Sequence, residues 1–271
     1  MTAPTILLFD SGMGGLTVAR AVRESLPDAH LVYAADNAAF PYGAWKEAEL
    51  IERIVTVLGR LIGRVRPDLA VIACNTASTL ALQALREAYQ LPFVGTVPAI
   101  KPAAAQTKTN VIGVLATPGT VSREYTQSLI HTYAFHCKVL LHGAKRLAEI
   151  AEHKLKGYPV DMEELRAEIA PVFRTRAGKR TDVVVLGCTH YPLLVQEITE
   201  VAPWPVTYID PAPAIARRVA ELLKTLELRP GSGGPAHGTV ILTSARGSGA
   251  ESLGAYANMG FPAHEILEVP V

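Results

Sequence analysis

Short runs of aliphatic residues alternate along the chain with longer stretches in which apolar residues recur at helical spacing. The runs predict strands at residues 5–9, 31–35, 69–73, 111–115, 138–141 and 182–186. The periodic stretches predict helices at residues 16–26, 47–65, 77–89, 122–133, 161–173 and 193–201. Because regular alternation of strand and helix is typical of βαβ units, we expect an α/β protein with mostly parallel sheets.

The first and second parts of this pattern match each other in register. Residues 6–12 resemble residues 111–119, and residues 71–76 resemble residues 184–189. The separations also agree, with 64 residues from Asp10 to Cys74 and 71 from Thr117 to Cys188. We therefore expect two similar doubly wound α/β domains related by a pseudo-twofold axis. Ligands of such sheets bind beyond the carboxyl ends of the strands, which predicts an active site in the cleft between the domains.

The last part of the chain extends beyond the second repeat. It predicts a helix at residues 212–226, a Gly/Pro-rich loop at 229–238 and a strand at 239–243. We expect this tail to return to the first domain and to add one strand to its sheet. The predicted domains are residues 1–96 together with 208–271, and residues 97–207.

Composition excludes several classes of protein. The 271 residues include 26 basic and 25 acidic ones, so the net charge of +1 gives no electrostatic footprint for nucleic acid or an anionic membrane. The apolar runs are far shorter than the roughly 18 residues of a membrane span. The first residues lack the basic and apolar regions of a secretory signal, so a cytoplasmic protein is expected. No long apolar stripe identifies an interface, which leaves a homodimer open.

Two of the three cysteines stand where chemistry is expected. Cys74-Asn75-Thr76 and Cys188-Thr189-His190 each follow a predicted strand and precede a helix. The positive end of a helix lowers the pKa of a thiol and favours the thiolate. Either cysteine alone is more often a small buried apolar residue. Two thiols facing each other across a cleft, however, form the geometry of a two-base racemase, in which one removes a proton and the other returns one.

Neighbouring residues could support this proton transfer. In the predicted arrangement, Asp10 lies beside Cys74 and His190 lies beside Cys188. The alternative interpretations are a helix cap for Asp10 and an ordinary loop residue for His190. The spacing of the cysteines contains no Cys-x-x-Cys pair, so neither zinc nor a redox dithiol is expected, and the three cysteines are predicted to be free thiols. No lysine stands in these motifs to bind pyridoxal phosphate, so no cofactor and no metal are expected.

Backbone amides in the same loops offer sites for a small zwitterion. The glycines of residues 10–15 permit a tight turn that presents N–H groups, but the segment lacks a nucleotide-binding pattern. Pro41-Tyr42-Gly43 is either an ordinary turn or a further source of amides. Together with Ser11, Asn75 and Thr76, these groups could hold a carboxylate or an ammonium group.

The motifs together resemble those of a known family. Residues 10–18 (DSGMGGLTV), 41–43 (PYG), 73–78 (ACNTAS) and 186–194 (LGCTHYPLL) are similar, in order and separation, to the signature segments of bacterial glutamate racemases in the aspartate/glutamate racemase family. The resemblance covers essentially the whole chain. It implies cofactor-independent interconversion of L- and D-glutamate, which supplies D-glutamate for peptidoglycan.

The resemblance also assigns residues. It implies that Cys74 and Cys188 are the proton donors and acceptors, tuned by Asp10 and His190. The substrate-binding residues that it implies are Asp10, Ser11, Pro41, Tyr42, Gly43, Asn75, Thr76, Thr117, Thr189 and His190. Glu152 is a weaker candidate, because the residues that precede its helix match the family poorly, and a solvated helix face is expected for it. Cys137 lacks either motif and is expected to be structural.

Three rival interpretations remain open. Aspartate racemase and related isomerases also use paired cysteines, although His190 favours glutamate in this resemblance. A module that binds an amino acid without chemistry would leave the second thiol unexplained. A thiol-redox protein would need the two Cα atoms within roughly 7 Å, closer than two bases that flank a substrate carbon.

Overall fold

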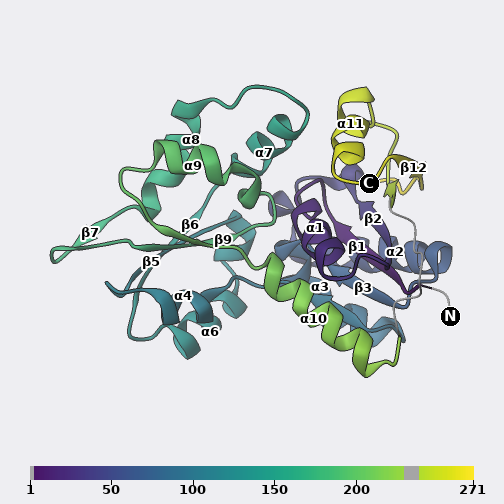
Figure 1. The fold of residues 1–271 in the computed structure, drawn as a ribbon, viewed down its shortest axis with the longest axis horizontal. Helices are drawn as coiled ribbons and strands as arrows, with labels where there is room; N and C mark the ends of the chain where they lie inside the picture. Colours follow the sequence, from purple (N-terminus) through teal and green to yellow (C-terminus); the bar gives the residue numbers. More distant parts are fainter. Residues whose placement is uncertain (1–2, 229–237) are drawn as a thin grey trace.

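The computed structural model describes residues 3–228 and 238–271, which form two α/β lobes side by side (Figure 1). The first sheet has six strands in the order β12-β11-β2-β1-β3-β4, and all its pairs are parallel. Its strands are β1 (Thr5–Asp10), β2 (His30–Ala35), β3 (Leu69–Ile72), β4 (Phe93–Gly95), β11 (Thr239–Leu242) and β12 (Ala263–Ile266). The expected α/β fold with parallel sheets is confirmed.

The second sheet has four parallel strands in the order β10-β9-β5-β6. Its strands are β5 (Val111–Ala116), β6 (Lys138–Gly143), β9 (Val183–Gly187) and β10 (Thr207–Ile209). Read from the other edge, the order β6-β5-β9-β10 matches β2-β1-β3-β4 of the first sheet. The strand that precedes each predicted cysteine motif, β3 or β9, therefore occupies the same position in its sheet, which is the repeat that the sequence predicts.

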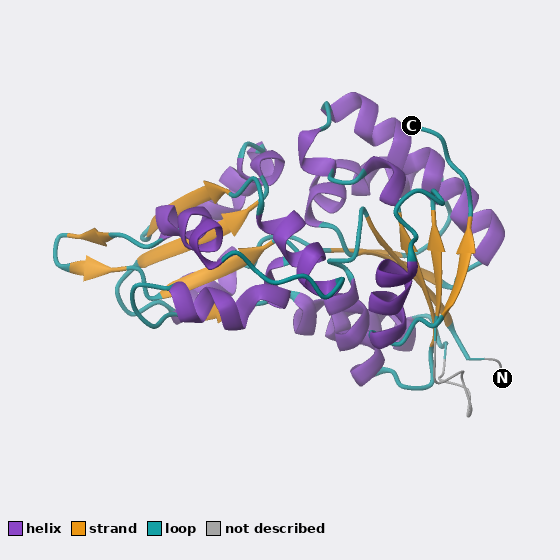
Figure 2. Cartoon of the chain, turned by 90° about the horizontal axis from the view of Figure 1, so that it is seen from above, coloured by secondary structure: helices purple, strands orange, loops and turns teal. Residues whose placement is uncertain are grey.

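Both faces of the first sheet are covered by helices, as Figure 2 shows. Ile6 and Leu8 of β1 point to a core shared with α1 (Leu16–Ser25), α10 (Ala212–Thr225) and α11 (Ala250–Asn258). Leu7 and Phe9 point to the opposite core, shared with α2 (Glu47–Val65) and α3 (Asn75–Ala88). Alternate residues of a strand point to opposite faces, so a strand buried on both faces is continuously apolar. This is why the β1 sequence shows no polar alternation.

The second sheet is built in the same way. Val184 and Leu186 of β9 pack against α7 (Leu147–Leu155), α8 (Met162–Ile169) and α9 (Val195–Val201). Val183 and Val185 pack on the other face with α4 (Ile100–Gln106) and α6 (Glu124–Tyr133). The remaining elements are the short helix α5 (Pro118–Val121), the 3₁₀ helices η1 (Asn37–Ala39), η2 (Tyr42–Ala44), η3 (Ala170–Val172) and η4 (Tyr191–Leu194), and the hairpin of β7 (Thr175–Arg176) and β8 (Lys179–Arg180).

Several predicted boundaries shift for local reasons. The helix predicted at 161–173 ends at Ile169, since Pro171 cannot continue it. The helix predicted at 77–89 begins at Asn75, which makes Cys74 its N-cap. The three-residue strands β4 and β10 were not predicted, because three residues are too few to show an alternating or apolar pattern.

The tail returns to the first lobe as expected, because β11 pairs with β2. The expectation of one added strand is wrong, since β12 pairs with β11 and extends the sheet by a second. All four residues of β12 are exposed, so no apolar pattern marks it. The predicted loop at 229–238 lies outside the described residues except for Gly238. Among the described residues, no helix is long and apolar enough to cross a membrane.

Candidate active site

The carboxyl ends of the central strands of the two sheets meet at one small cavity. Its lining residues are Ser11, Phe40, Pro41, Tyr42, Gly43, Cys74, Asn75, Thr76, Thr117, Ala148, Cys188, Thr189 and His190. Of the predicted site residues, all except Asp10 line this cavity, and Asp10 is buried directly behind Ser11. The cavity volume is about 20 Å³, which is room for about one water molecule. Segments far apart in the sequence thus bring the predicted residues to one place.

Cys74 lies at the N-cap of α3 and is almost completely buried. Its Sγ lies 3.9 Å from the Ser11 hydroxyl oxygen. Burial raises the pKa of the Cys74 thiol, and the charge of Asp10 adds to this, while the Ala77 N–H of the helix and the Ser11 hydroxyl oppose it. The expectation that the helix end gives this thiol a low pKa is therefore wrong for Cys74, because desolvation outweighs the helix contribution.

Cys188 lies in a different local setting. After β9 the chain makes a turn and enters the 3₁₀ helix η4 rather than an α-helix. The expectation that Cys188 stands at the N-terminus of an α-helix is therefore wrong. Its polar neighbour is instead a side chain, since Sγ lies 3.6 Å from His190 Nδ1. The two cysteines are both free and line the same cavity, but they differ in the groups that surround them.

His190 is almost completely buried and lines the cavity. Burial lowers its pKa, but contacts with Cys188 and Glu152 outweigh burial and hold the pKa well above 6.5. The other ring nitrogen, Nε2, lies 3.1 Å from the Gly14 nitrogen and 3.1 Å from Glu152 Oε1. Because one neighbour is a donor and the other an acceptor, the protonated and unprotonated forms of Nε2 each find a partner.

Glu152 is buried, so the expectation of a solvated helix face is wrong. Its Oε1 accepts a hydrogen bond from the Met13 N–H at 2.8 Å, and its Oε2 lies 3.7 Å from Lys156 Nζ. Burial raises the pKa of Glu152, but the hydrogen bond and charge of His190 and the Met13 N–H outweigh it, so the pKa is lowered. The helix α7 that carries Glu152 packs its apolar side against β9, in the core that contains Val184 and Leu186. Glu152 is therefore turned toward the first lobe, where its carboxylate contacts Met13.

Asp10 is the last residue of β1 and has no exposed surface. Its carboxylate accepts hydrogen bonds from the Gly12 N–H at 2.9 Å and from the Thr189 hydroxyl at 2.9 Å. Burial raises the pKa of Asp10, and the positive charge of His190 and these two donors only partly offset that increase. Asp10 therefore contacts residues that line the cavity without lining it itself.

Asn75 and Thr76 begin α3 and line the cavity. Asn75 Oδ1 accepts from the Thr96 hydroxyl at 3.1 Å, whereas buried Asn75 Nδ2 has no hydrogen-bond partner in the part of the chain that the structure describes. The hydroxyls of Thr76 and Thr117 lie 3.1 Å apart, across the lobe boundary. Since an unpaired buried amide is costly, Asn75 Nδ2 is a donor available to a ligand.

The segment with Pro41, Tyr42 and Gly43 forms another wall. The Tyr42 hydroxyl donates to Asp36 at 2.5 Å, which holds the buried ring in place. A Cβ on Gly43 would lie 3.4 Å from the Thr117 Cβ, so this wall also touches the second lobe. Sequence reasoning missed Phe40, Ala148 and Asp36. Asp36 directly follows β2, as Asp10 ends β1, and that position at a strand end was the signal that could have identified it.

A larger cavity lies elsewhere between the lobes. Its volume is about 790 Å³, and Lys101, Tyr133, Asp210 and Arg218 are among the residues that line it. It contains neither cysteine of the predicted pair and none of the predicted binding residues. The volume of a cavity therefore does not identify the candidate active site. The side chains that can transfer protons identify it instead.

Comparison with known proteins agrees with the fold. A sequence model of the Asp/Glu/hydantoin racemase family matches residues 16–219. The chain belongs to this family. It is 56% identical over 220 residues to the glutamate racemase of Brucella anthropi, which covers 81% of this chain and 79% of that protein.

Solved structures extend the similarity to the whole chain. The crystal structure of Escherichia coli glutamate racemase, in complex with L-glutamate and the activator UDP-MurNAc-Ala, is 42% identical with a TM-score of 0.90, covering 99% of this chain and 100% of that one. The glutamate racemase isoform RacE1 of Bacillus anthracis is 27% identical with a TM-score of 0.82, over the full length of both chains.

Proposed function

We propose that this protein interconverts L- and D-glutamate without a cofactor, using Cys74 and Cys188 as the two proton-transfer groups. Family membership and the similarity to glutamate racemases support the reaction and the substrate. The observation that carries the mechanism is that both thiols, at equivalent positions of the two sheets, line one cavity with polar groups suited to a zwitterion.

In the proposed reaction, one thiolate removes the Cα proton and the opposite thiol donates its proton to the other face of the carbanion. Each turnover therefore exchanges the protonation states of the two sulfurs. Burial raises the pKa of Cys74 and so favours its thiol form at rest, while His190, whose pKa is raised, lies 3.6 Å from Cys188 Sγ on the opposite side of the proton path. Asn75 Nδ2 and the amides near Tyr42 and Gly43 would hold the substrate.

Glutamate is much larger than the cavity of about 20 Å³, so the lobes must separate to admit it. We propose that residues 1–96 with 210–271 form one moving lobe and residues 97–209 the other. The boundary expected at residue 208 is moved past Ile209, because β10 pairs with β9 of the second sheet. The D-glutamate formed would serve peptidoglycan synthesis in the cytoplasm.

The decisive experiment is proton NMR of the purified protein in deuterium oxide without added pyridoxal phosphate. L-glutamate and then L-aspartate are supplied, and loss of the Cα proton signal is followed together with optical rotation. Exchange with loss of rotation for glutamate alone is expected. Exchange of aspartate instead would identify an aspartate racemase, and exchange of neither would favour a binding module.

A further inference from the structure

The carboxylate of Asp36 is the centre of a buried polar network beside the candidate active site. Asp36 has no exposed surface. Its Oδ2 accepts from the Tyr42 hydroxyl at 2.5 Å and from Arg53 Nε at 2.7 Å. Its Oδ1 accepts from a terminal nitrogen of Arg53 at 2.6 Å and from the Thr243 hydroxyl at 2.6 Å. The first lobe thus fixes this carboxylate from three separate segments.

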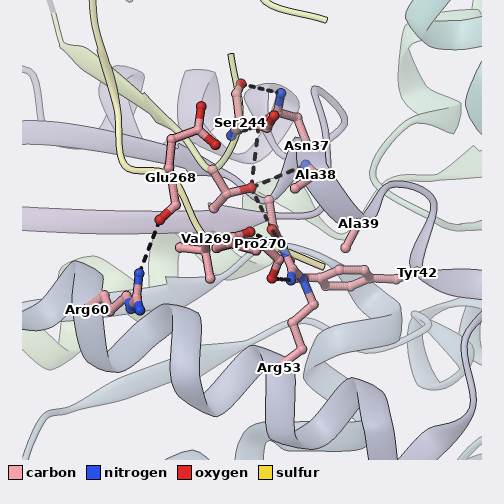
Figure 3. A network of polar contacts seen from close by, with 12 residues as sticks. Asn37, Ala38, Ala39, Tyr42, Arg53, Arg60, Ser244, Glu268, Val269 and Pro270 are labelled. Carbon is pink, nitrogen blue, oxygen red and sulfur yellow. Dashed lines mark hydrogen bonds and ion pairs between the residues drawn. The ribbon is translucent and has the colours of Figure 1, made fainter. Parts of the chain in front are cut away.

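Arg53 of α2 links the network to the C-terminal segment, here called the strap (residues 267–270). The two terminal nitrogens of Arg53 donate to the Pro270 carbonyl at 2.9 Å and to the Val269 carbonyl at 3.2 Å, as Figure 3 shows. The Val269 N–H donates to the Thr243 carbonyl at 3.0 Å. The strap therefore packs along β11 and returns to α2, where one guanidinium joins it to Asp36.

This arrangement favours a role in positioning. Moving an arginine and an aspartate out of water is expensive, and a buried ion pair is weak evidence for stability. Here the network is directly bonded to Tyr42, whose buried ring and neighbours Pro41 and Gly43 line the cavity. Any displacement of Asp36 would therefore move the wall that faces the substrate.

We propose that Arg53, supported by the strap, is a positioning residue for the reaction, holding the Pro41-Tyr42-Gly43 wall through Asp36. This inference rests on the proposed function for its kinetic consequence. The wall contacts the substrate and transfers no proton, so disturbing it is expected to weaken glutamate binding more than the proton transfer itself.

The chain offers a matched pair of substitutions for the test. Arg53→Lys keeps the positive charge beside Asp36 but loses the planar fork that reaches the carboxylate and both carbonyls at once. Arg60→Lys is the control, because Arg60 lies on the same helix and donates to the strap at the Glu268 carbonyl, at 3.1 Å, without contacting Asp36 (Figure 3). We expect Arg53→Lys to raise the KM for glutamate about tenfold with a smaller change in kcat. Arg60→Lys should stay within about twofold of wild type.

A second readout does not depend on racemisation. The rate at which iodoacetamide alkylates Cys74, measured by peptide mass spectrometry, should rise in Arg53→Lys because a loosened wall admits the reagent. Cys137, outside the cavity, is the internal reference and should react at an unchanged rate. A variant ending at Glu268 removes both strap carbonyls but keeps the Arg53–Asp36 pair, and should shift KM and alkylation in the same direction. This variant carries the test if Arg53→Lys fails to fold.

The results separate the two proposals. If the wild type racemises glutamate but Arg53→Lys matches Arg60→Lys in both KM and Cys74 alkylation, the network has no positioning role, whatever its effect on the melting temperature. If the wild type does not racemise glutamate, the proposed function fails, while faster Cys74 alkylation in Arg53→Lys would still support control of the wall by Arg53.

Discussion

The Thr189 hydroxyl of the second lobe donates a 2.9 Å hydrogen bond to the buried Asp10 carboxylate of the first. This contact joins the ends of β1 and β9, the two strands that meet at the candidate site. It is also one of the donors that offset the effect of burial on the pKa of Asp10. The bond therefore holds the two lobes together and also favours the charged form of the Asp10 carboxylate.

Thr189→Val removes this hydroxyl at nearly constant volume. A hydrogen bond to a charged group contributes about 1.5–3 kcal/mol, so the free energy of unfolding should fall by that order in urea denaturation. Thr225→Val is the control, since the exposed Thr225 hydroxyl bonds, within the described residues, only to the Glu221 carbonyl of its own helix. Equal stability of the two variants would show that the link between lobes contributes nothing.

Gly14 is expected to tolerate no side chain. A Cβ at this position would lie 2.3 Å from His190 Nδ1, so Gly14→Ala must displace the imidazole from Cys188. A misplacement near 1 Å can cost about 100-fold in rate, and kcat/KM should fall by that order in a coupled racemisation assay. Gly254→Ala in α11 is the control, because its Cβ would lie more than 4 Å from every other residue that the structure describes, apart from its chain neighbours and the helix backbone. That variant should keep full activity and gain up to about 1 kcal/mol of stability.

The sequence was informative where its signals are local. Helix α2 was predicted at its observed bounds because its apolar face is long and regular, and the loops after β1, β3 and β9 were identified because short motifs stand at strand ends. The burial of Glu152 and the high pKa of Cys74 could not be predicted, since both depend on how the lobes pack against each other. The same is true of Asp36, whose partners Arg53 and Thr243 are distant in sequence.

The raised pKa of His190 predicts how stability changes with pH. The folded protein keeps a proton that the unfolded chain releases near pH 6.5, so this stabilisation is complete below pH 6.5 and is lost as the pH rises through the folded-state pKa. The free energy of unfolding should fall between pH 7 and 8.5 by at most about 1.4 kcal/mol per pH unit. Thermal or urea denaturation at several pH values measures this slope.

Glu152→Gln tests the cause of that slope. Cys188 and the hydrogen bond with Glu152 both raise the pKa of His190, and the substitution weakens the second of these, so the decline in stability between pH 7 and 8.5 should become shallower. Glu149→Gln on the same helix is the matched control, because Glu149 pairs with Arg146 at the surface. A slope that Glu152→Gln leaves unchanged would mean that another group titrates in this range.

The two cysteines should be individually indispensable, since each thiol acts in every turnover of the proposed reaction. Cys74→Ala and Cys188→Ala should each reduce racemisation in both directions by roughly 10²–10⁴-fold or more, the usual contribution of a general acid or base. Cys137→Ala should remain fully active, because Cys137 lies outside the cavity. Serine is a far poorer base than a thiolate, so Cys74→Ser and Cys188→Ser should each lose deuterium exchange with a different enantiomer first. Loss of exchange with the same enantiomer in both variants would contradict the assignment of one thiol to each face of Cα.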